Sequence, residues 1–447
     1  MPRVLWVISV AMMYAGPLLA STSSTAIFCQ KYPKAADCSS QQASCNVCHA
    51  GPPSLNAYGE DLKGVLSGPI DNFLLEALDK VEGVDSDEDG ASNLDEITHG
   101  GAPGNRNVRP VTEAKITYDP AIALRRLKAV YCGSSVSFAE NEALKAAADP
   151  KAYLHERLSE CLSSPYWKQE ALQRLADKKI QPLAAIGFGG NVVIADYRWD
   201  YRLFAYVMSD DRDVRELLSA TYHVDEAGNK VEGVIARQEQ AQVGQRIVIG
   251  GGQPLAANRR AGMITTQWFL ANNTMFSILP RNTASQAYRE YLGLDIAKGE
   301  GLMPVANEPR DVDNRRVKAP DCAVCHSTLD PLSYAFSTYV GIDPIRAFLA
   351  NANGTYSAGR APWEAQGQIL GQPTMNLLQW AELARNSDAF KKNIAHMMFY
   401  QALSREPMPH EKKEFEALWQ ELDTDNYSVN KMLHRFIETS AFGGRKS

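Results

Sequence analysis

The pattern C-x-x-C-H occurs twice in this 447-residue chain, at residues 45–49 and at residues 322–326. The residues concerned are Cys45, Cys48, His49, Cys322, Cys325 and His326. The spacing allows two thiols to form thioether bonds with the vinyl groups of one haem, while the adjacent histidine lies under the iron and supplies a nitrogen ligand. The two motifs therefore predict two covalently attached haems of the c type.

Paired cysteines also occur in zinc knuckles and in redox-active disulfides. A zinc site needs a second pair nearby, but these two pairs lie near opposite ends of the chain. A histidine follows both pairs, which favours haem over either alternative.

The first residues predict export. Arg3 supplies a positive charge, residues 4–20 are mainly apolar, and small residues follow. These are the parts of a secretory signal peptide, with candidate cleavage after Ala20 or Ala26. An uncleaved anchor is the alternative, but a glycine and a proline interrupt a stretch near the lower length limit for a membrane span. We assign residues 1–26 to the signal and expect a periplasmic or extracytoplasmic protein with no membrane span after cleavage.

Four cysteines lie outside the two motifs: Cys29, Cys38, Cys132 and Cys161. In an oxidising compartment they can pair as Cys29–Cys38 and Cys132–Cys161. Spacing alone does not determine connectivity, and buried free thiols are the alternative.

The sixth ligand of each iron decides its chemistry, because a strong ligand favours electron transfer and an open position permits peroxide or oxygen chemistry. For the second haem Met375 is the first candidate, since its separation from His326 is typical of small cytochromes c. The rivals His396, Met397 and Met398 lie in an apolar helical stretch, where core packing better explains methionine.

The first haem has fewer candidates, because no methionine occurs between His49 and Met208. His99 is the nearby histidine and would give two histidine ligands. Tyr58, a residue from a later segment, or an open site are the alternatives.

Residues 85–96 match the twelve-residue calcium-binding loop. Acidic side chains occupy the first, third and fifth positions, and Gly90 occupies the sixth, where the chain turns sharply. The expected ligands are Asp85, Asp87, Asp89, the Ala91 carbonyl, Asn93 and Glu96. The loop is single, and Ser92 replaces the usual aliphatic residue, so we expect a structural calcium. If His99 binds iron, calcium would fix its approach.

Helical periodicity dominates the rest of the chain, which predicts a mainly α fold. We expect two cytochrome c-like modules, at residues 27–108 and 311–447, flanking a large helical middle domain at 109–310. The glycines at 250–252 resemble a dinucleotide-binding loop, but Leu255 replaces its third glycine, so we expect a strand or turn. The net charge of −6 argues against a nucleic-acid partner.

Several segments resemble a family of multi-segment cytochromes common in planctomycetes. The segments that carry the resemblance are 260–265 (RAGMIT), 268–270 (WFL), 322–326 (CAVCH), 330–336 (DPLSYAF) and 390–405. The last of them ends in Leu403-Ser404-Arg405, a departure from the family's Leu-Gly-Arg-like turn. Residues 45–59 resemble a separate small cytochrome module that often carries an aspartate-rich calcium loop. The resemblance implies haem and electron transfer, and it supplies no substrate.

These observations predict an exported di-haem cytochrome that exchanges electrons with a redox partner protein or a small-molecule donor or acceptor. A haem-dependent oxidoreductase of the peroxidase type, with one open iron, is the second interpretation. A binding module, in which haem is structural and the helical middle recognises a partner, is the third.

Overall fold

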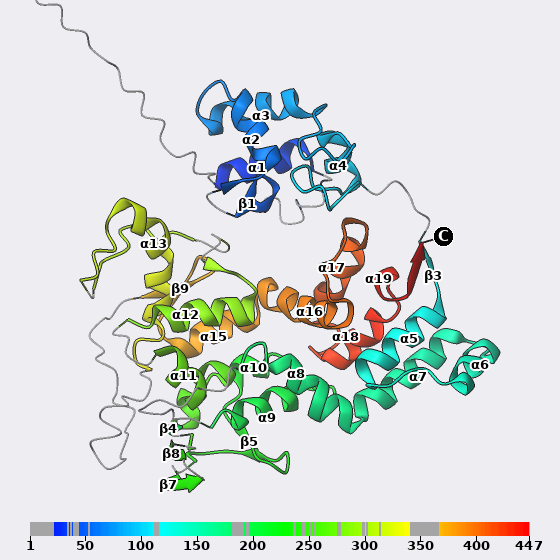
Figure 1. Ribbon diagram of the computed structural model, residues 1–447. Coiled ribbons are helices and arrows are strands. Elements are labelled where there is room, and N and C mark those ends of the chain that lie inside the picture. The colour runs from blue at the N-terminus through cyan, green and yellow to red at the C-terminus, as the bar shows by residue number, and fades with distance from the viewer. Residues whose placement is uncertain are drawn as a thin grey trace, which may run out of the picture. The chain divides into compact units, whose positions relative to one another are not determined.

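The computed structural model divides the chain into two compact units, Met1–Glu113 and Ala114–Ser447. It is mainly helical with a few short strands, as predicted (Figure 1). The structure describes residues 22–33, 35, 38, 44–51, 54–110, 116–180, 192–193, 196–235, 238–243, 246–250, 252–253, 255–274, 279–296, 300, 303–312, 314–339 and 366–446. The expected module boundary at 108 lies close to the division between the units, whereas residues on both sides of 310 share the second unit.

Most of the predicted signal segment lies outside the described residues. Helix α1 spans Thr22–Lys31 and crosses the candidate cleavage position after Ala26. Cleavage after Ala20 would leave this helix whole.

The N-terminal unit packs four helices around a small core. Its elements are α1, the 3-10 turn η2 (Cys45–Val47), β1 (His49–Gly51), β2 (Ser54–Leu55), α2 (Ala57–Val65), α3 (Ile70–Val81) and α4 (Asn93–His99). Helix α3 buries Leu74, Leu78 and Val81 at helical spacing, and these side chains form its inner face. A disulfide joins Cys29 of α1 to Cys38, which confirms the first predicted pairing.

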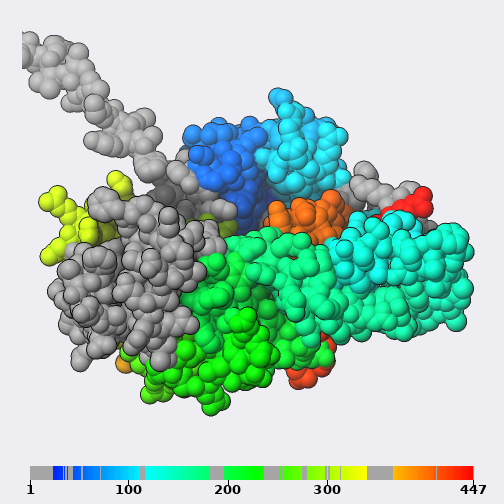
Figure 2. All heavy atoms as spheres, turned by 60° about the horizontal axis from the view of Figure 1, so that its bottom comes forward, coloured from blue at the N-terminus to red at the C-terminus, as the bar shows by residue number. Residues whose placement is uncertain are grey.

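The C-terminal unit begins with a helical array. Its first elements are β3 (Ile116–Tyr118), α5 (Pro120–Tyr131), α6 (Phe138–Ala146), α7 (Pro150–Ser163), the π-helical turn η3 (Tyr166–Ala171), α8 (Leu172–Ala176), α9 (Arg198–Val207) and α10 (Glu216–Ser219). Helices α5 and α7 each begin at an Asp-Pro pair, in which the aspartate caps the helix and the proline occupies its first position. In Figure 2 helices α5–α7, in cyan, adjoin the green α8 and α9.

Helices also dominate the later part of this unit. They are α11 (Gln267–Thr274), α12 (Arg281–Ala287) with the π turn η6 (Tyr288–Leu292), α13 (Pro320–Tyr334), α15 (Leu377–Arg385), α16 (Asp388–Leu403), α17 (Lys412–Gln420), α18 (Val429–Phe436) and α19 (Ser440–Gly443). The shorter 3-10 turns are η4 (Ala257–Arg259), η5 (Gly262–Thr265) and η8 (Pro409–Glu411).

Short strands complete the unit. They are β4 (Val192–Val193), β5 (His223–Val224), β6 (Lys230–Val231), β7 (Gln238–Val243), β8 (Arg246–Gly250), β9 (Gly367–Ile369), β10 (Gln372–Thr374) and β11 (Gly444–Lys446). Strand β8 pairs with β4 and β7, and it ends at the first glycine of the 250–252 run, which agrees with the predicted strand.

One hydrophobic core unites the second unit from Ala123 to Phe442. The unit closes on itself where β11 pairs antiparallel with β3. The Tyr118 hydroxyl reinforces this closure by donating to the Ile437 carbonyl at 2.6 Å. Because the core includes residues from both sides of position 310, the C-terminal motif sits on a scaffold that the middle segment helps to build.

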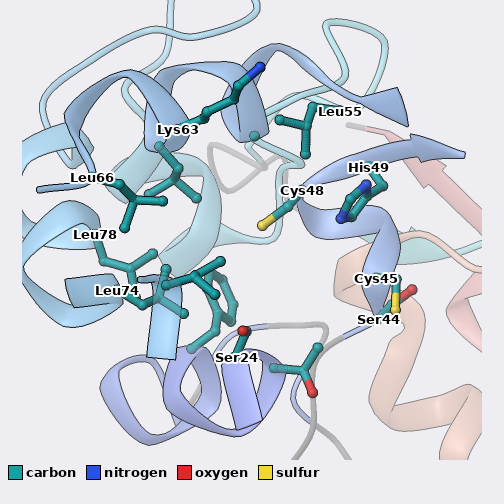
Figure 3. Close-up of a pocket in the computed structure, with 15 residues that line it drawn as sticks. Ser24, Ser44, Cys45, Cys48, His49, Leu55, Lys63, Leu66, Leu74 and Leu78 are labelled. Carbon is teal, nitrogen blue, oxygen red and sulfur yellow. The ribbon is translucent and has the colours of Figure 1, made fainter. Parts of the chain in front are cut away.

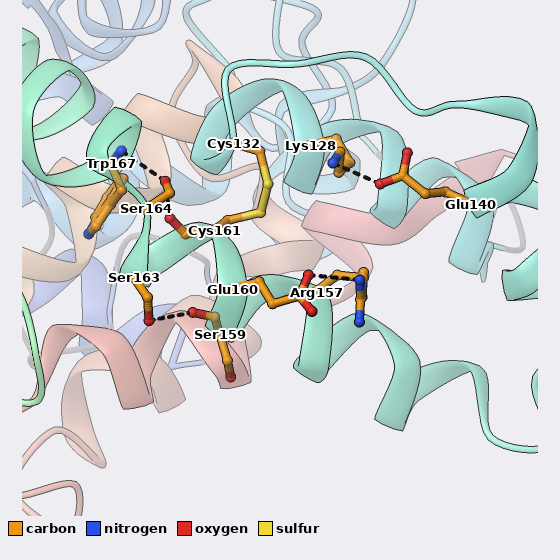
Figure 4. Close-up of a disulfide and its surroundings, with 10 residues drawn as sticks. All are labelled: Lys128, Cys132, Glu140, Arg157, Ser159, Glu160, Cys161, Ser163, Ser164 and Trp167. Carbon is orange, nitrogen blue, oxygen red and sulfur yellow. Dashed lines mark hydrogen bonds and ion pairs between the residues drawn. A yellow bond between two sulfur atoms is a disulfide. The ribbon is translucent and has the colours of Figure 1, made fainter.

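A second disulfide joins Cys132, which follows α5, to Cys161 of α7 (Figure 4), and this confirms the other predicted pairing. Nearby, Lys128 of α5 pairs with Glu140 of α6 at 2.8 Å. Among the described residues, no helix is both long enough and apolar enough to span a bilayer.

Replacing Phe436 by alanine should strongly destabilise the C-terminal unit. Its ring is 1% exposed and contacts Phe399 and Phe442. The variant loses burial and leaves a cavity, which should lower the free energy of unfolding by about 3–5 kcal/mol. Chemical denaturation measures the change. Phe138→Ala is the matched control, because that ring is 81% exposed and its loss should change stability by less than about 0.5 kcal/mol.

Candidate functional site

The N-terminal motif is a single tight turn followed by a strand. Ser44 caps it by accepting the Asn46 amide at 3.2 Å, and the Cys48 amide donates to the Cys45 carbonyl at 3.2 Å. His49 then begins β1, whose partner is Leu55 on β2. This turn brings Cys45, Cys48 and His49 to one pocket.

Helix α2 holds the motif in place through Asn56. The Asn56 side chain accepts the Gly59 amide at 2.8 Å and donates to the Val47 carbonyl at 2.9 Å. A Cβ atom at position 59 would collide with the Cys48 carbonyl oxygen, so only glycine permits this close packing. The backbone of the motif is therefore fixed by the first turn of α2.

An apolar pocket, part of which is open to solvent, lies beside the motif (Figure 3). The lining residues are Ser24, Thr25, Phe28, Ser44, Cys45, Cys48, His49, Leu55, Gly59, Leu62, Lys63, Leu66, Ile70, Leu74 and Leu78. Figure 3 shows the Cys48 sulfur directed into the pocket, with Leu66, Leu74 and Leu78 on the side opposite His49.

The donor set of this pocket fits a haem attached through the motif. Cys45 and Cys48 form no disulfide. His49 is only 7% exposed, and its Nδ1 has no hydrogen-bond partner among the described residues. The other walls supply the apolar surface that a porphyrin face requires, and they come from α1, α2 and α3.

The structure does not bring His99 to this pocket. His99 ends α4, its side chain is 59% exposed, and its Nδ1 lies 2.8 Å from an Asp95 carboxylate oxygen. Tyr58 does not line the pocket either; it is fully buried, and burial raises the pKa of its hydroxyl. The described residues that line the pocket include one histidine, His49, and no methionine.

The acidic loop between α3 and α4 has the conformation expected of a calcium site. Asp85 accepts the backbone amides of Asp89 and Gly90, at 3.1 and 2.8 Å. Gly90 adopts a positive φ of 100°, as the sharp turn requires. Carboxylate oxygens of Asp85, Asp87 and Asp89 lie within 4.8 Å of one another.

Glu96 completes the acidic cluster from the first turn of α4. It is fully buried, and neither carboxylate oxygen has a hydrogen bond of normal geometry within the described residues. Burial, followed by repulsion from Asp87 and Asp89, raises the pKa of Glu96 to about 8. A divalent cation would offset both costs by supplying the missing partner.

Ala91 and Asn93, the other two predicted calcium ligands, differ in their hydrogen bonds. Ala91 continues the loop, and its amide donates to Asp89 at 2.9 Å. The Asn93 side chain is buried and closes the loop instead, because its amide group donates to the Val81 carbonyl at 2.7 Å and to the Ser86 hydroxyl at 2.9 Å.

The C-terminal motif lies in helix α13, where both Cys322 and Cys325 are exposed. Pro331 interrupts this helix and cannot donate to the Ser327 carbonyl. The Val305 amide takes its place and donates to that carbonyl at 3.1 Å. The segment before α13 is thereby tied to the helix that carries the motif.

His326 contacts a buried carboxylate that the sequence did not single out. Its Nδ1 lies 2.9 Å from Oδ1 of Asp330, one helical turn along α13. Asp330 is fully buried and also binds Arg281 of α12, with Nε–Oδ1 and Nη2–Oδ2 distances of 2.6 and 2.9 Å. The sequence offered one indication of this contact, because side chains at i and i+4, as at His326 and Asp330, are neighbours on a helix.

Met375 lies directly after the β9–β10 hairpin and is 75% exposed. The hairpin packs on α13, because Gly367 lies against the backbone of Pro331 and Ala335. The rivals have other contacts: Met398 is buried in the core, Met397 packs against it, and His396 pairs with Glu406 at 2.6 Å.

Comparison of the chain with family models, curated proteins and solved structures finds no match.

Calcium should stabilise the N-terminal unit, and Glu96→Gln should abolish the effect. At a calcium concentration one hundred times its dissociation constant, the gain should be about 2.7 kcal/mol. The neutral amide relieves the repulsion at Glu96 but removes a charged ligand, so the variant should be no less stable than the unmodified protein in chelator. Thermal unfolding with and without calcium measures both effects. Glu88→Gln is the control, because Glu88 is an exposed loop residue outside the ligand set and its variant should keep the full response.

Proposed function

We propose that this chain is an exported c-type cytochrome that carries two covalently attached haems and transfers electrons. The observation that supports this most strongly is the apolar pocket that Cys45, Cys48 and His49 line together. A redox disulfide or a zinc knuckle would not need an apolar pocket beside the thiols. Each haem supplies reversible one-electron exchange between ferric and ferrous iron.

In this proposal the N-terminal site works through attachment, ligation and exclusion of water. The thiols of Cys45 and Cys48 would hold the haem through thioether bonds to its vinyl groups, and His49 would supply a nitrogen ligand to its iron. The apolar side chains of α2 and α3 keep water from most of the ring, which limits the reorganisation that accompanies a change of charge.

At the C-terminal site Cys322, Cys325 and His326 would take the same three roles from α13. Both thiols are exposed and therefore accessible for attachment. Met375 remains the proposed sixth ligand, because an exposed thioether on a hairpin that packs against α13 is available to the iron.

We also propose a structural calcium at Asp85, Asp87, Asp89 and Glu96, with the Ala91 carbonyl as a further ligand. The buried position of the Glu96 carboxylate beside Asp87 and Asp89 supports this most directly. The cation would fix the connection between α3, which lines the pocket, and α4. The two disulfides are consistent with the oxidising compartment that export implies.

A haem-dependent oxidoreductase is the second candidate function. It is favoured by one observation, namely that the described residues lining the N-terminal pocket offer His49 and no second histidine or methionine. Electron paramagnetic resonance of the oxidised protein separates the two functions. Low-spin signals from both irons favour electron transfer, and a high-spin signal that disappears with the Cys45 and Cys48 variants favours the oxidoreductase.

Replacing Cys45 and Cys48 together by alanine should remove one haem per chain, and replacing Cys322 and Cys325 should remove the other. The pyridine haemochrome assay measures haem per protein in each variant. Met375→Ala is the control and should keep two haems, because thioether attachment does not depend on the sixth ligand. Retention of two haems by either double variant would contradict the proposal.

A further inference from the structure

The two motif histidines have different surroundings. Nδ1 of His326 lies 2.9 Å from a carboxylate oxygen of Asp330. Nδ1 of His49 is buried and has no hydrogen-bond partner among the described residues. Because the two motifs supply the same three donor groups, this difference sets the two sites apart.

The Asp330 carboxylate is held in place by an arginine. It is fully buried, and Arg281 clamps it with two hydrogen bonds, at 2.6 and 2.9 Å. A paired, charge-assisted arrangement of this kind fixes the position of both groups. Asp330 Oδ1 therefore lies between Arg281 Nε and His326 Nδ1, and helices α12 and α13 together set its position.

This contact decides which nitrogen of His326 is available. An ionised carboxylate only accepts hydrogen bonds, so the short contact requires a proton on Nδ1. Nε2 then keeps its lone pair. A carboxylate on the far nitrogen of a ligating histidine also raises the basicity of the ligand and fixes the ring orientation.

We infer that Asp330, clamped by Arg281, is a positioning residue that lowers the reduction potential of the C-terminal haem. The inference rests on the proposed function. A more basic His326 would donate more electron density to the iron and favour its ferric over its ferrous state. Among the described residues, Nδ1 of His49 has no hydrogen-bond partner, so the same effect is not expected there.

The test is a spectroelectrochemical titration of the full-length holoprotein and of Asp330→Asn. The asparagine can still accept from Nδ1, but it carries no charge. We expect two redox waves in the unmodified protein. In the variant the wave of the C-terminal haem should rise by at least 59 mV, a tenfold change in the one-electron equilibrium constant, and the wave of the N-terminal haem should not move.

Glu411→Gln is the matched control, because Glu411 is 3% exposed and is clamped by Arg405 with two contacts of 2.6 Å. It loses the same charge in the same unit without touching a motif histidine, so neither wave should move. An Asp330→Asn variant that leaves both waves unchanged would overturn the inference.

A single-haem protein assigns the waves. The protein with Cys45 and Cys48 replaced by alanine keeps only the C-terminal haem, and adding Asp330→Asn to it should raise its single potential by the same amount. An unchanged potential would overturn the inference while leaving the proposed function intact. A chain that attaches no haem would instead overturn the proposed function.

Discussion

A cysteine–histidine motif can hold a large planar group only where its backbone is fixed, and in this chain packing against neighbouring segments fixes both copies. At the first motif Asn56 bonds to the Val47 carbonyl, and Gly59 allows α2 to reach the Cys48 carbonyl. At the second, Pro331 frees the Ser327 carbonyl for Val305, and Asp330 ties α13 to Arg281. The positions of the thiols and imidazoles follow from these contacts.

The same construction leads to two unlike sites. The first has a buried histidine beside an apolar pocket, and the walls of that pocket include α1, α2 and α3 of the N-terminal unit. The second has exposed thiols on a helix whose inner face belongs to the large core of the C-terminal unit. Two attachment sites with the same chemistry and different surroundings are what an electron-transfer protein needs in order to give its carriers different potentials.

Much of this organisation could be predicted from the sequence because it depends on local patterns. The mainly α fold and both disulfide pairings were predicted correctly, and the strand or turn expected at the 250–252 glycines is a strand that ends at Gly250. The Asp85 loop also followed from spacing, since a twelve-residue loop specifies its own turn.

The remainder depends on contacts between distant segments. The pocket residues from α1 and α3, and the Arg281 clamp on Asp330, join positions far apart in the chain, and periodicity carries no information about them. His99 was the nearest histidine in sequence, but its helix ends with the side chain exposed beside Asp95. Asn93 fitted the spacing of a calcium ligand, yet its amide is used to close the loop.

The intact mass of the purified, fully denatured protein tests the central claim most directly. Denaturation releases any group held only by packing or ligation, whereas thioether bonds survive it. The account predicts a mature chain whose mass is increased by two haems, with one haem on each of two peptides after proteolysis, 45–49 and 322–326. A denatured chain without added haem mass would contradict it.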